Sequence, residues 1–466
     1  MKRRDFLTGS ALAGTSLLMG GSVAGGAMLT GCSDGGKSGG VNDFVLKSRE
    51  ELGLPLSLRK AVDGKPLRAG LIGCGGRATG AGTQFIQAGD GLSVVALAEA
   101  LQERLDGGLK YFNEKMKQNI SKDHAFLGFD AYKKVIALPE VDVIIAAVPP
   151  RFHPEIFKAA VDAGKPVFIE KPFAVDAAGV RTVLVAAKQA DQKGLSVCCG
   201  TYRRHMNNYI ETYRRVASGM IGEIVGGACY WNTARTWYRD RRPEWSDTEH
   251  VLYNWLNYPF MGGDCINDHQ IHNIDVVRWF MGDKTPMRAI GQGAKIRPSL
   301  GNKYDFFMVD YEFENNIHII SSTRHIDQCS DLIGEVVRGT KGSSNCSDTI
   351  WDEKGNVIYK YEPEKDENGK PIDDYSGFQQ EHIDWVTSIR ENKPFNDANN
   401  MANSTLACIM GRESAYTGKT YTWDQILVDQ NLLGPDITQP GFKIPEEHPL
   451  PGKATEPHKD TKISVY

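Results

Sequence analysis

The sequence has no excess of charge of either sign. Its 466 residues carry 54 Lys and Arg against 58 Asp and Glu, which gives a formal net charge of -4. Proteins that bind nucleic acid electrostatically need a strongly basic face or stripe. The near-neutral balance therefore gives no support for a nucleic-acid partner, and we expect none.

Cysteine is sparse, and its spacing does not indicate a metal site. Nine cysteines occur, with no CxxC pair and no Cys/His cluster of the kind that binds zinc. Cys198 and Cys199 are adjacent, and neighbouring cysteines rarely form a disulfide with each other. We expect no metal and interpret most of the cysteines as reduced and buried.

A long, strongly apolar run is missing as well. Residues 6–33 are uncharged but diluted by glycines, whereas a membrane-spanning helix needs about 20 predominantly apolar residues. We therefore interpret residues 1–32 as a targeting segment. RRDFL resembles a twin-arginine signal. Leu29–Cys32 resembles a lipobox, whose cysteine becomes the lipid-bearing mature N-terminus, and cleavage after Ala24 is the alternative.

These signals predict export of the folded protein to the periplasmic side of a bacterial envelope. The twin-arginine route carries folded proteins, often with a cofactor already inside. A lipid on Cys32 is then the only predicted attachment to a membrane. Residues 33–66, which include the flexible stretch GGKSGG, are expected to form a linker and an N-terminal arm.

The sequence has no internal repeats, and its length suggests two or three domains. Short apolar runs alternate with amphipathic ones from residue 67 to residue 200, and the run VDVIIAAV is continuously apolar, as a strand buried on both faces of a parallel sheet requires. This alternation predicts a doubly wound α/β domain. The expected strands are 68–73, 92–98, 141–148, 166–169 and 196–199, and the expected helices are 76–88, 101–117, 152–163 and 176–192.

After residue 200 the pattern changes to longer alternating strands. Residues 201–425 are expected to form an α+β domain with an open, largely antiparallel sheet. Residues 426–466, rich in proline and charge, are expected to form an irregular arm. The expected strands are 306–313, 317–323 and 332–338, and the expected helices are 268–281, 379–391 and 401–417.

A glycine-rich turn joins the first predicted strand to the first predicted helix. It contains Gly73, Gly75 and Gly76, followed by Arg77. Glycines there permit a tight turn and let the backbone approach a pyrophosphate, which the helix N-terminus stabilises. Ala78 replaces the third glycine of the G-x-G-x-x-G pattern, an accepted variant. We therefore predict a dinucleotide site.

Glu99 ends the second predicted strand. A carboxylate at that position can bind both ribose hydroxyls and would repel a 2′-phosphate, so NAD is favoured over NADP. The alternative is an ordinary surface carboxylate.

Four motifs occur in order between about residues 67 and 420: GCGGRATG, AAVPPRFHPEI, the EKP that begins at Glu170, and GGDCINDHQIHNID. Together they resemble the glucose-fructose oxidoreductase/inositol dehydrogenase (Gfo/Idh/MocA) family. The resemblance implies a Rossmann domain joined to an α/β domain whose open sheet often forms an oligomer interface, hence a homodimer or homotetramer. Members mostly oxidise or reduce carbons of sugars and cyclitols with NAD(P). Some exported members hold the cofactor permanently, and a few use bound NAD for transient oxidation while they cleave glycosides.

The resemblance also implies the catalytic residues. Lys171 corresponds to the motif lysine near the reacting hydroxyl, and Asp268 and His272 correspond to the D-x-x-x-H pair of the family. Residues four apart at the start of a helix share one face, so Asp268 is expected to orient His272 and to favour its protonated form. We predict His272 as general acid/base and Lys171 as the group that stabilises charge on the substrate oxygen.

Further residues near the carboxyl edge of the sheet are predicted to contact the cofactor. His153 either lines the nicotinamide pocket or caps the following helix. The predicted cofactor contacts outside the glycine turn are Glu99, Pro149, His153, Glu170, Lys171 and Tyr202.

Aromatic and arginine side chains interleave from residue 230 to residue 260, which holds four of the eight tryptophans. Flat rings suit sugar faces and guanidinium groups suit hydroxyls, although core aromatics with a charged rim explain the pattern equally well. This segment has no simple family template. The residues predicted to bind substrate are Arg203, Arg235, Trp237, Tyr238, Asn267 and His269.

The sequence therefore predicts an exported NAD-dependent oxidoreductase that acts on a sugar, glycoside or cyclitol carbon. Because free NAD is scarce outside the cell, the cofactor is expected to be tightly bound and to be reset by a second sugar-like substrate. Two alternatives stay open: an NAD-dependent glycosidase that works by transient oxidation and elimination, and a non-catalytic sugar-binding lipoprotein.

Overall fold

The computed structural model describes residues 45–298, 300–369 and 376–451. The predicted signal, the lipobox, residues 33–44 of the linker and the last residues of the arm lie outside this part of the chain. Among the described residues, no helix is long and apolar enough to cross a membrane.

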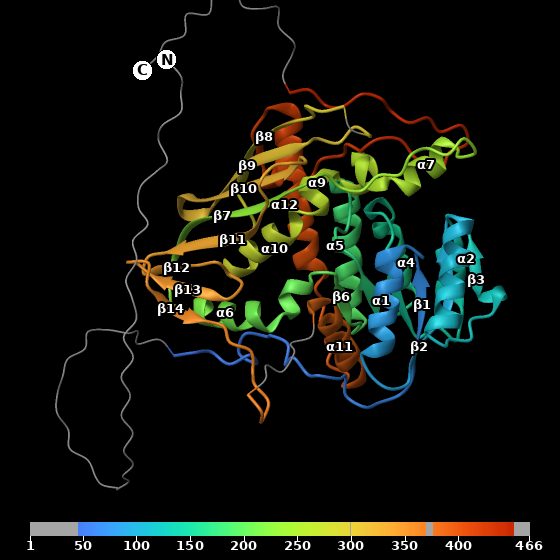
Figure 1. The fold of residues 1–466 in the computed structure, drawn as a ribbon, viewed down its shortest axis with the longest axis horizontal. Coiled ribbons are helices and arrows are strands. Elements are labelled where there is room, and N and C mark those ends of the chain that lie inside the picture. Colours follow the sequence, from blue (N-terminus) through green and yellow to red (C-terminus); the bar gives the residue numbers. More distant parts are fainter. Residues whose placement is uncertain (1–44, 299, 370–375, 452–466) are drawn as a thin grey trace, which may run out of the picture. The chain divides into compact units, whose positions relative to one another are not determined.

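Residues 67–199 form the predicted Rossmann domain around a six-stranded parallel sheet of order β3-β2-β1-β4-β5-β6 (Figure 1). The central strand β4 is buried along its whole length, as its continuously apolar sequence predicts. The strands are β1 (Leu67–Ile72), β2 (Leu92–Glu99), β3 (Ala125–Leu127), β4 (Val143–Ala146), β5 (Val167–Ile169) and β6 (Val197–Cys199).

The four predicted helices are present, and the structure adds a strand and a helix that the sequence analysis did not predict, β3 and α3 (Ala131–Ala137). The Asp176 side chain accepts a hydrogen bond from the Gly179 amide and caps α5 at its N-terminus. The second helix ends as an α-helix at Lys110 and continues as a π-helical stretch, Tyr111–Lys115, instead of running regularly to residue 117. The helices are α1 (Gly76–Gln87), α2 (Gln102–Lys110), α3 (Ala131–Ala137), α4 (His153–Asp162) and α5 (Ala177–Gln192).

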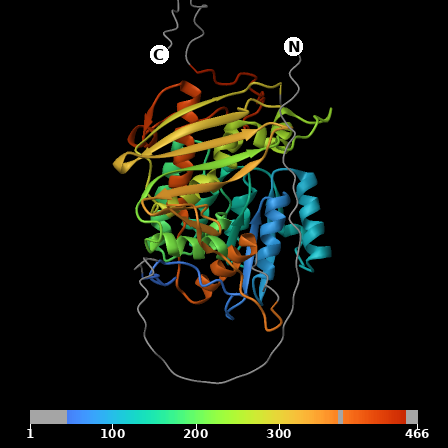
Figure 2. The same ribbon diagram turned by 60° about the vertical axis from the view of Figure 1, so that its left-hand side comes forward.

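The second domain contains the predicted open sheet, which has nine strands in the order β14-β13-β12-β11-β7-β10-β9-β8-β15 (Figure 2). Neighbouring strands are antiparallel except β7 and β10, which run parallel. The strands are β7 (Ile224–Thr233), β8 (Arg288–Ala294), β9 (Phe306–Phe313), β10 (Ile317–His325), β11 (Leu332–Gly339), β12 (Gly342–Ser344), β13 (Thr349–Asp352), β14 (Val357–Lys360) and β15 (Tyr421–Thr422).

One face of this sheet is covered by helices, and the other presents apolar side chains. Helices α10 and α12 pack on the covered face, and α12 also packs against α5 of the Rossmann domain. The opposite face exposes Ile290, Met308 and Leu332. The helices are α6 (Asn207–Ala217), α7 (Asp247–Tyr253), α8 (Pro259–Gly262), α9 (Asp264–Asp268), α10 (Ile271–Phe280), α11 (Gly377–Arg390), α12 (Ala398–Thr417) and α13 (Trp423–Leu427).

The helix α11 returns to the Rossmann domain, although the sequence predicted residues 201–425 as one second domain. It packs against α1 and β6, and Asn396 forms a β-bridge with Val197. Trp385 of α11 is fully buried, packs near Phe85 and Phe168, and donates from Nε1 to the Ser196 carbonyl. The domains are therefore interleaved in sequence.

Replacement of Trp385 by alanine is expected to lower the free energy of unfolding by about 3–5 kcal/mol, because it empties a buried site and removes a hydrogen bond. Val185→Ala on the exposed side of α5 is the matched control, with an expected change within about 0.5 kcal/mol. Urea unfolding followed by tryptophan fluorescence and circular dichroism compares the two. Equal midpoints for both variants would contradict this role of α11.

Candidate active site

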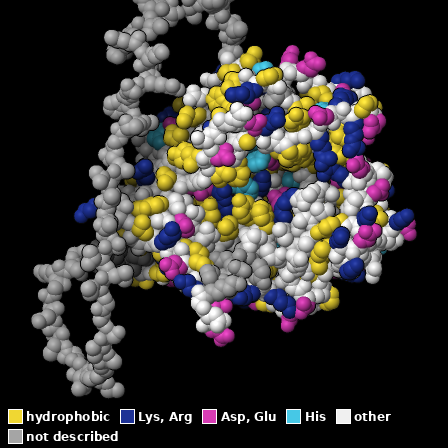
Figure 3. Space-filling view, in the orientation of Figure 1, with side chains coloured by type: hydrophobic (Ala, Val, Ile, Leu, Met, Phe, Trp, Pro, Cys, Tyr) yellow, Lys and Arg dark blue, Asp and Glu magenta, His cyan; other side chains and the backbone are white. Residues whose placement is uncertain are grey.

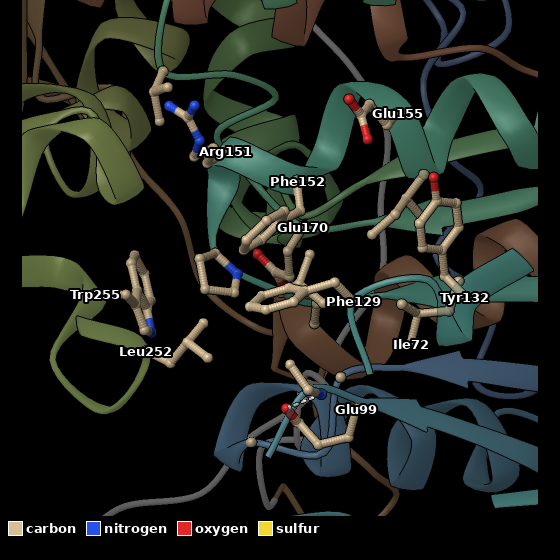
Figure 4. A pocket seen from close by; sticks show the side chains of 18 of the residues that line it. Ile72, Glu99, Phe129, Tyr132, Arg151, Phe152, Glu155, Glu170, Leu252 and Trp255 are labelled. Atoms are coloured by element: carbon tan, nitrogen blue, oxygen red, sulfur yellow. Dashed lines mark hydrogen bonds between the residues drawn. The ribbon is translucent and has the colours of Figure 1, made fainter. Parts of the chain in front are cut away.

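A cavity of about 1530 Å³ runs from the glycine turn to the predicted catalytic residues. The face of the molecule in Figure 3 is hollowed near its middle, where histidine and basic side chains are visible. Figure 4 shows Glu99, Phe129 and Glu170 from the Rossmann side, with Leu252 and Trp255 on the other side. The cavity therefore lies at the carboxyl ends of the parallel strands, where ligands bind in open α/β sheets.

The glycine turn is shaped for close approach of a phosphate. Gly73 has a φ of +95°, and a Cβ atom there would lie 2.6 Å from the Ala147 carbonyl oxygen. Gly75 caps α1 without any side-chain hydrogen bond, and the first turn of α1 has no acidic residue. The N-terminus of α1 can thus present its amides to an anion. Gly73, Gly75 and Gly76 all line the cavity, so the turn fits a dinucleotide.

Glu99 lies at the end of β2 and lines the cavity, as expected for the ribose-binding carboxylate. Its oxygens accept hydrogen bonds from the amides of Cys74 (2.8 Å) and Ala100 (2.6 Å). In this structure Glu99 therefore also holds the glycine turn against the end of β2. Its predicted bonds to ribose stay a prediction.

Arg77 was predicted to contact the cofactor, and it does line the cavity. Its guanidinium group is ion-paired with Glu170 and, at 2.8 Å, with Glu381 of α11. It also lies 4.8 Å from the centre of the Phe378 ring. Glu381 is fully buried, and burial raises its pKa well above the usual value against the opposing charge of Arg77. The sequence carried no local signal for Glu381, because its partner is 304 residues away.

Lys171 and Asp268 meet at the inner end of the cavity. The Lys171 ammonium donates a 2.5 Å hydrogen bond to the Asp268 carbonyl oxygen and lies 3.8 Å from Oδ1 of its carboxylate. Both residues line the cavity. The two predicted catalytic residues are thus brought together across 97 residues of sequence.

The helix predicted over residues 268–281 is present as α10, but it begins only at Ile271, because a short interruption separates it from α9. Asp268 ends α9, and His272 is the second residue of α10. The imidazole beside the Asp268 carboxylate is instead that of His269, whose Nδ1 lies 3.1 Å from Oδ2 without hydrogen-bond geometry. The His272 ring contacts the edge of Tyr202 and stacks with Trp231, at centroid distances of 5.0 and 5.7 Å.

Burial determines the charge of this cluster. It raises the pKa of Asp268, and the charges of Lys171 and Lys303 oppose that shift. It lowers the pKa of His269 and of His272 well below 6.5, with Lys171 acting in the same direction. The structure therefore favours neutral imidazoles, which corrects the prediction that Asp268 keeps His272 protonated.

His153 is fully buried and does not line the cavity, which corrects its prediction as a cofactor contact. Its Nδ1 lies 2.7 Å from the Pro172 carbonyl oxygen, so that nitrogen carries the proton and donates. Burial lowers the pKa of His153 to about 4. Its role in the structure is to hold the segment that follows Lys171. Pro149 and Glu170 do line the cavity.

Tyr202 and Arg203, two more predicted site residues, lie near His272 but do not line the cavity. Tyr202 stacks on Phe378 at 4.3 Å between ring centres. Arg203 is buried and ion-paired with the buried Glu335 of β11. Because a buried guanidinium needs a carboxylate partner, Arg203 holds the turn that follows β6 against β11 of the nine-stranded sheet and is not placed to bind substrate.

The remaining substrate candidates separate into two groups. Trp237 and His269 line the cavity. Arg235 is exposed and pairs with Asp327, and Tyr238 lies beside Arg235 at the surface. Asn267 is buried, and its amide donates to the Ala174 carbonyl. Arg235, Tyr238 and Asn267 do not line the cavity, so the structure gives them no substrate contact.

Sequence reasoning missed part of the cavity wall. Leu252 and Trp255 belong to the aromatic segment, in which only neighbouring positions were singled out. Leu432 comes from the C-terminal arm, which passes over the Rossmann domain. The Leu433 amide donates to Asp176, and its carbonyl accepts from Arg151. An irregular arm has no periodicity that could have revealed this contact.

The fold and the cavity define a dinucleotide-binding protein with a Rossmann domain and a second α+β domain. Two family descriptions match the chain: "Oxidoreductase family, NAD-binding Rossmann fold" over residues 67–198, and "GFO/IDH/MocA C-terminal domain" over residues 209–344. The chain belongs to the Gfo/Idh/MocA oxidoreductase family, and residues 67–198 form its NAD-binding domain.

Several relatives are inositol dehydrogenases. The chain is 32% identical to inositol 2-dehydrogenase of Paracoccus denitrificans over 173 residues, which is 37% of this chain and 45% of that protein. It is 27% identical to inositol 2-dehydrogenase of Salmonella typhimurium over 220 residues, 47% of this chain and 55% of that protein. The chain thus spans about half the length of these curated relatives.

Solved structures support the fold. Myo-inositol 2-dehydrogenase from Lactobacillus plantarum has a TM-score of 0.58 at 20% identity, over 77% of this chain and 99% of that one. Scyllo-inositol dehydrogenase from Lactobacillus casei, with bound NAD(H) and scyllo-inositol, has a TM-score of 0.57 at 18% identity, over 77% and 99% of the two chains.

Gly73→Ala is expected to abolish NAD binding or weaken it severely, because the new Cβ atom would meet the Ala147 carbonyl and strain a positive φ. Gly80→Ala in α1 is the matched control, since its Cβ would meet only the end of the Arg77 side chain, at 3.6 Å. Calorimetric titration with NAD+ compares the two. Tight binding by Gly73→Ala would contradict the assignment of this turn to the cofactor.

Proposed function

We propose that the protein is an NAD-dependent oxidoreductase that transfers hydride between a tightly held nicotinamide cofactor and a hydroxyl-bearing carbon of a carbohydrate or cyclitol. The main evidence is that one cavity is lined both by the glycine turn and by Lys171, Asp268 and His272. Its relatives include inositol dehydrogenases, which supports a polyhydroxylated substrate. Glu99 at the end of β2 supports NAD over NADP.

When bound, NAD supplies the hydride acceptor for an alcohol carbon. The residues of this chain supply the acid–base chemistry. The neutral imidazole of His272 accepts the proton of the substrate hydroxyl as the C–H bond gives up its hydride and the carbonyl forms. Lys171 donates a hydrogen bond to the substrate oxygen and stabilises its developing charge, while Asp268 holds the Lys171 ammonium in place.

The cavity walls that come from outside the Rossmann domain support tight retention of the cofactor. Trp237 and Leu252 form part of one wall, and Leu432 and Thr438 of the C-terminal arm also line it. These segments lie outside the Rossmann domain, so a dinucleotide in the cavity would contact both domains. Retention agrees with the proposed export of the folded protein and its anchoring through Cys32, because a captive cofactor does not depend on an external supply of NAD.

The exposed apolar face of the nine-stranded sheet supports a homo-oligomer. Ile290, Met308 and Leu332 lie on this face, on three different strands. Burying such a face against a second copy removes apolar area from water.

The first test is to identify the nucleotide carried by the purified exported protein after denaturation, by mass and absorbance. Near-stoichiometric NAD or NADH is expected. Addition of single sugars and cyclitols should then change the absorbance of the bound nicotinamide, and a second polyol or keto-sugar should reverse it. Release of sugar from an aryl glycoside without net NADH would instead indicate the glycosidase. Sugar binding without any spectral change would indicate a non-catalytic protein.

Lys171→Met and His272→Gln are each expected to lower turnover by about 10²–10⁴-fold, because each removes a group that stabilises or moves charge at the reacting oxygen. Bound nucleotide should stay near the wild-type amount in His272→Gln. His318→Gln is the matched control, since His318 is half-exposed on β10 and pairs with Asp310. Full activity in both variants would overturn the proposed mechanism.

A further inference from the structure

Two arginines lie beside the glycine turn, one from each domain. Arg104 belongs to α2, and Arg239 belongs to the segment between β7 and α7. Both line the main cavity and a second cavity of about 310 Å³, and both cavities also reach Gly75 and Gly76. The two cavities meet at the turn that fits a pyrophosphate.

The Tyr253 ring positions both guanidinium groups. Arg104 lies 5.3 Å and Arg239 5.6 Å from its centre, as in cation–π contacts. The Tyr253 hydroxyl donates to the Glu103 carboxylate at 2.9 Å, and Arg242 pairs with the same carboxylate at 3.1 Å. Arg242 therefore forms the ion pair with Glu103, and among the described residues neither Arg104 nor Arg239 forms an ion pair with a carboxylate.

One donor of the partly buried Arg104 guanidinium is unsatisfied in the described part of the chain. Its Nε is buried and has no hydrogen-bond partner among the described residues. Its Nη1 lies 2.7 Å from the position that a Cβ on Gly75 would take, so the guanidinium rests directly on the glycine turn. A desolvated donor without an acceptor is costly. An anion at the turn would satisfy it.

We propose that Arg104 and Arg239 bind phosphate oxygens of the dinucleotide, opposite the amides of the α1 N-terminus. The planar fork of arginine matches phosphate oxygens and forms charge-assisted hydrogen bonds. The segment that carries Arg239 then completes the cofactor site from outside the Rossmann domain. This inference rests on the proposed function, and it identifies residues through which both domains hold the cofactor.

The test is titration of the nucleotide-free protein with NAD+ and with NADP+, using wild type, Arg104→Gln and Arg239→Gln. Each variant should bind the dinucleotide about ten- to a hundredfold more weakly, the usual effect of losing one charged hydrogen bond. Arg241→Gln is the matched control, because Arg241 lies in the same segment, pairs with Asp247 and lines neither cavity. It should bind as wild type does. Thermal unfolding of each variant verifies that it is folded. Arg239 is exposed, so Arg239→Gln is expected to fold and still tests the proposal if Arg104→Gln is unstable.

The pattern of losses identifies the phosphate. Equal losses for NAD+ and NADP+ assign the arginines to the bridging pyrophosphate, and a loss confined to NADP+ assigns them to a 2′-phosphate. Wild-type affinity of both variants for both dinucleotides would overturn the arginine site while leaving the proposed function intact. A wild-type protein that binds neither dinucleotide would overturn the proposed function itself, and this site with it.

Discussion

The guanidinium group of Arg77 holds three separate parts of the chain together from a partly buried position. Arg77 is the second residue of α1, and its partners are Glu170, which directly follows β5, and Glu381 in α11. Buried charges are stable only when they are paired, and removing one partner leaves another uncompensated. The glycine turn, the start of the EKP motif and α11 must therefore assemble together. The position of Lys171, next to Glu170, depends on that assembly.

Desolvation also decides the chemistry at the other end of the cavity. His272 is buried and His269 is partly buried near Lys171, and desolvation lowers the pKa of both imidazoles, so their neutral forms are favoured, while burial makes Asp268 harder to ionise. Neutral imidazoles can accept a proton from a hydroxyl group, which suits an alcohol oxidation. A helical D-x-x-x-H pair in water would have the opposite preference, because an exposed carboxylate stabilises an imidazolium. The break between α9 and α10 separates Asp268 from His272 and removes that coupling.

The cavity itself is built by segments that are distant in sequence. The turns after the parallel strands form its Rossmann side, and the aromatic segment and the C-terminal arm supply further walls. Arg151 illustrates the connection, because it lines the cavity and donates to the Leu433 carbonyl of the arm. These added segments surround a fold that is shared with inositol dehydrogenases of low sequence identity. Differences in substrate and in cofactor retention are expected to originate there.

Sequence alone determined the features that depend on local patterns. Continuous apolar runs identified the parallel strands, the glycine turn identified the dinucleotide site, and short motifs identified Lys171, Asp268 and the family. The tertiary structure decided which polar side chains reach the cavity. Buried partners already bind the polar side chains of Arg203, Asn267 and His153. Arg104 and Arg239, in contrast, line the cavity. Such pairings join residues far apart in sequence, and their energy depends on burial, which no local pattern of residues specifies.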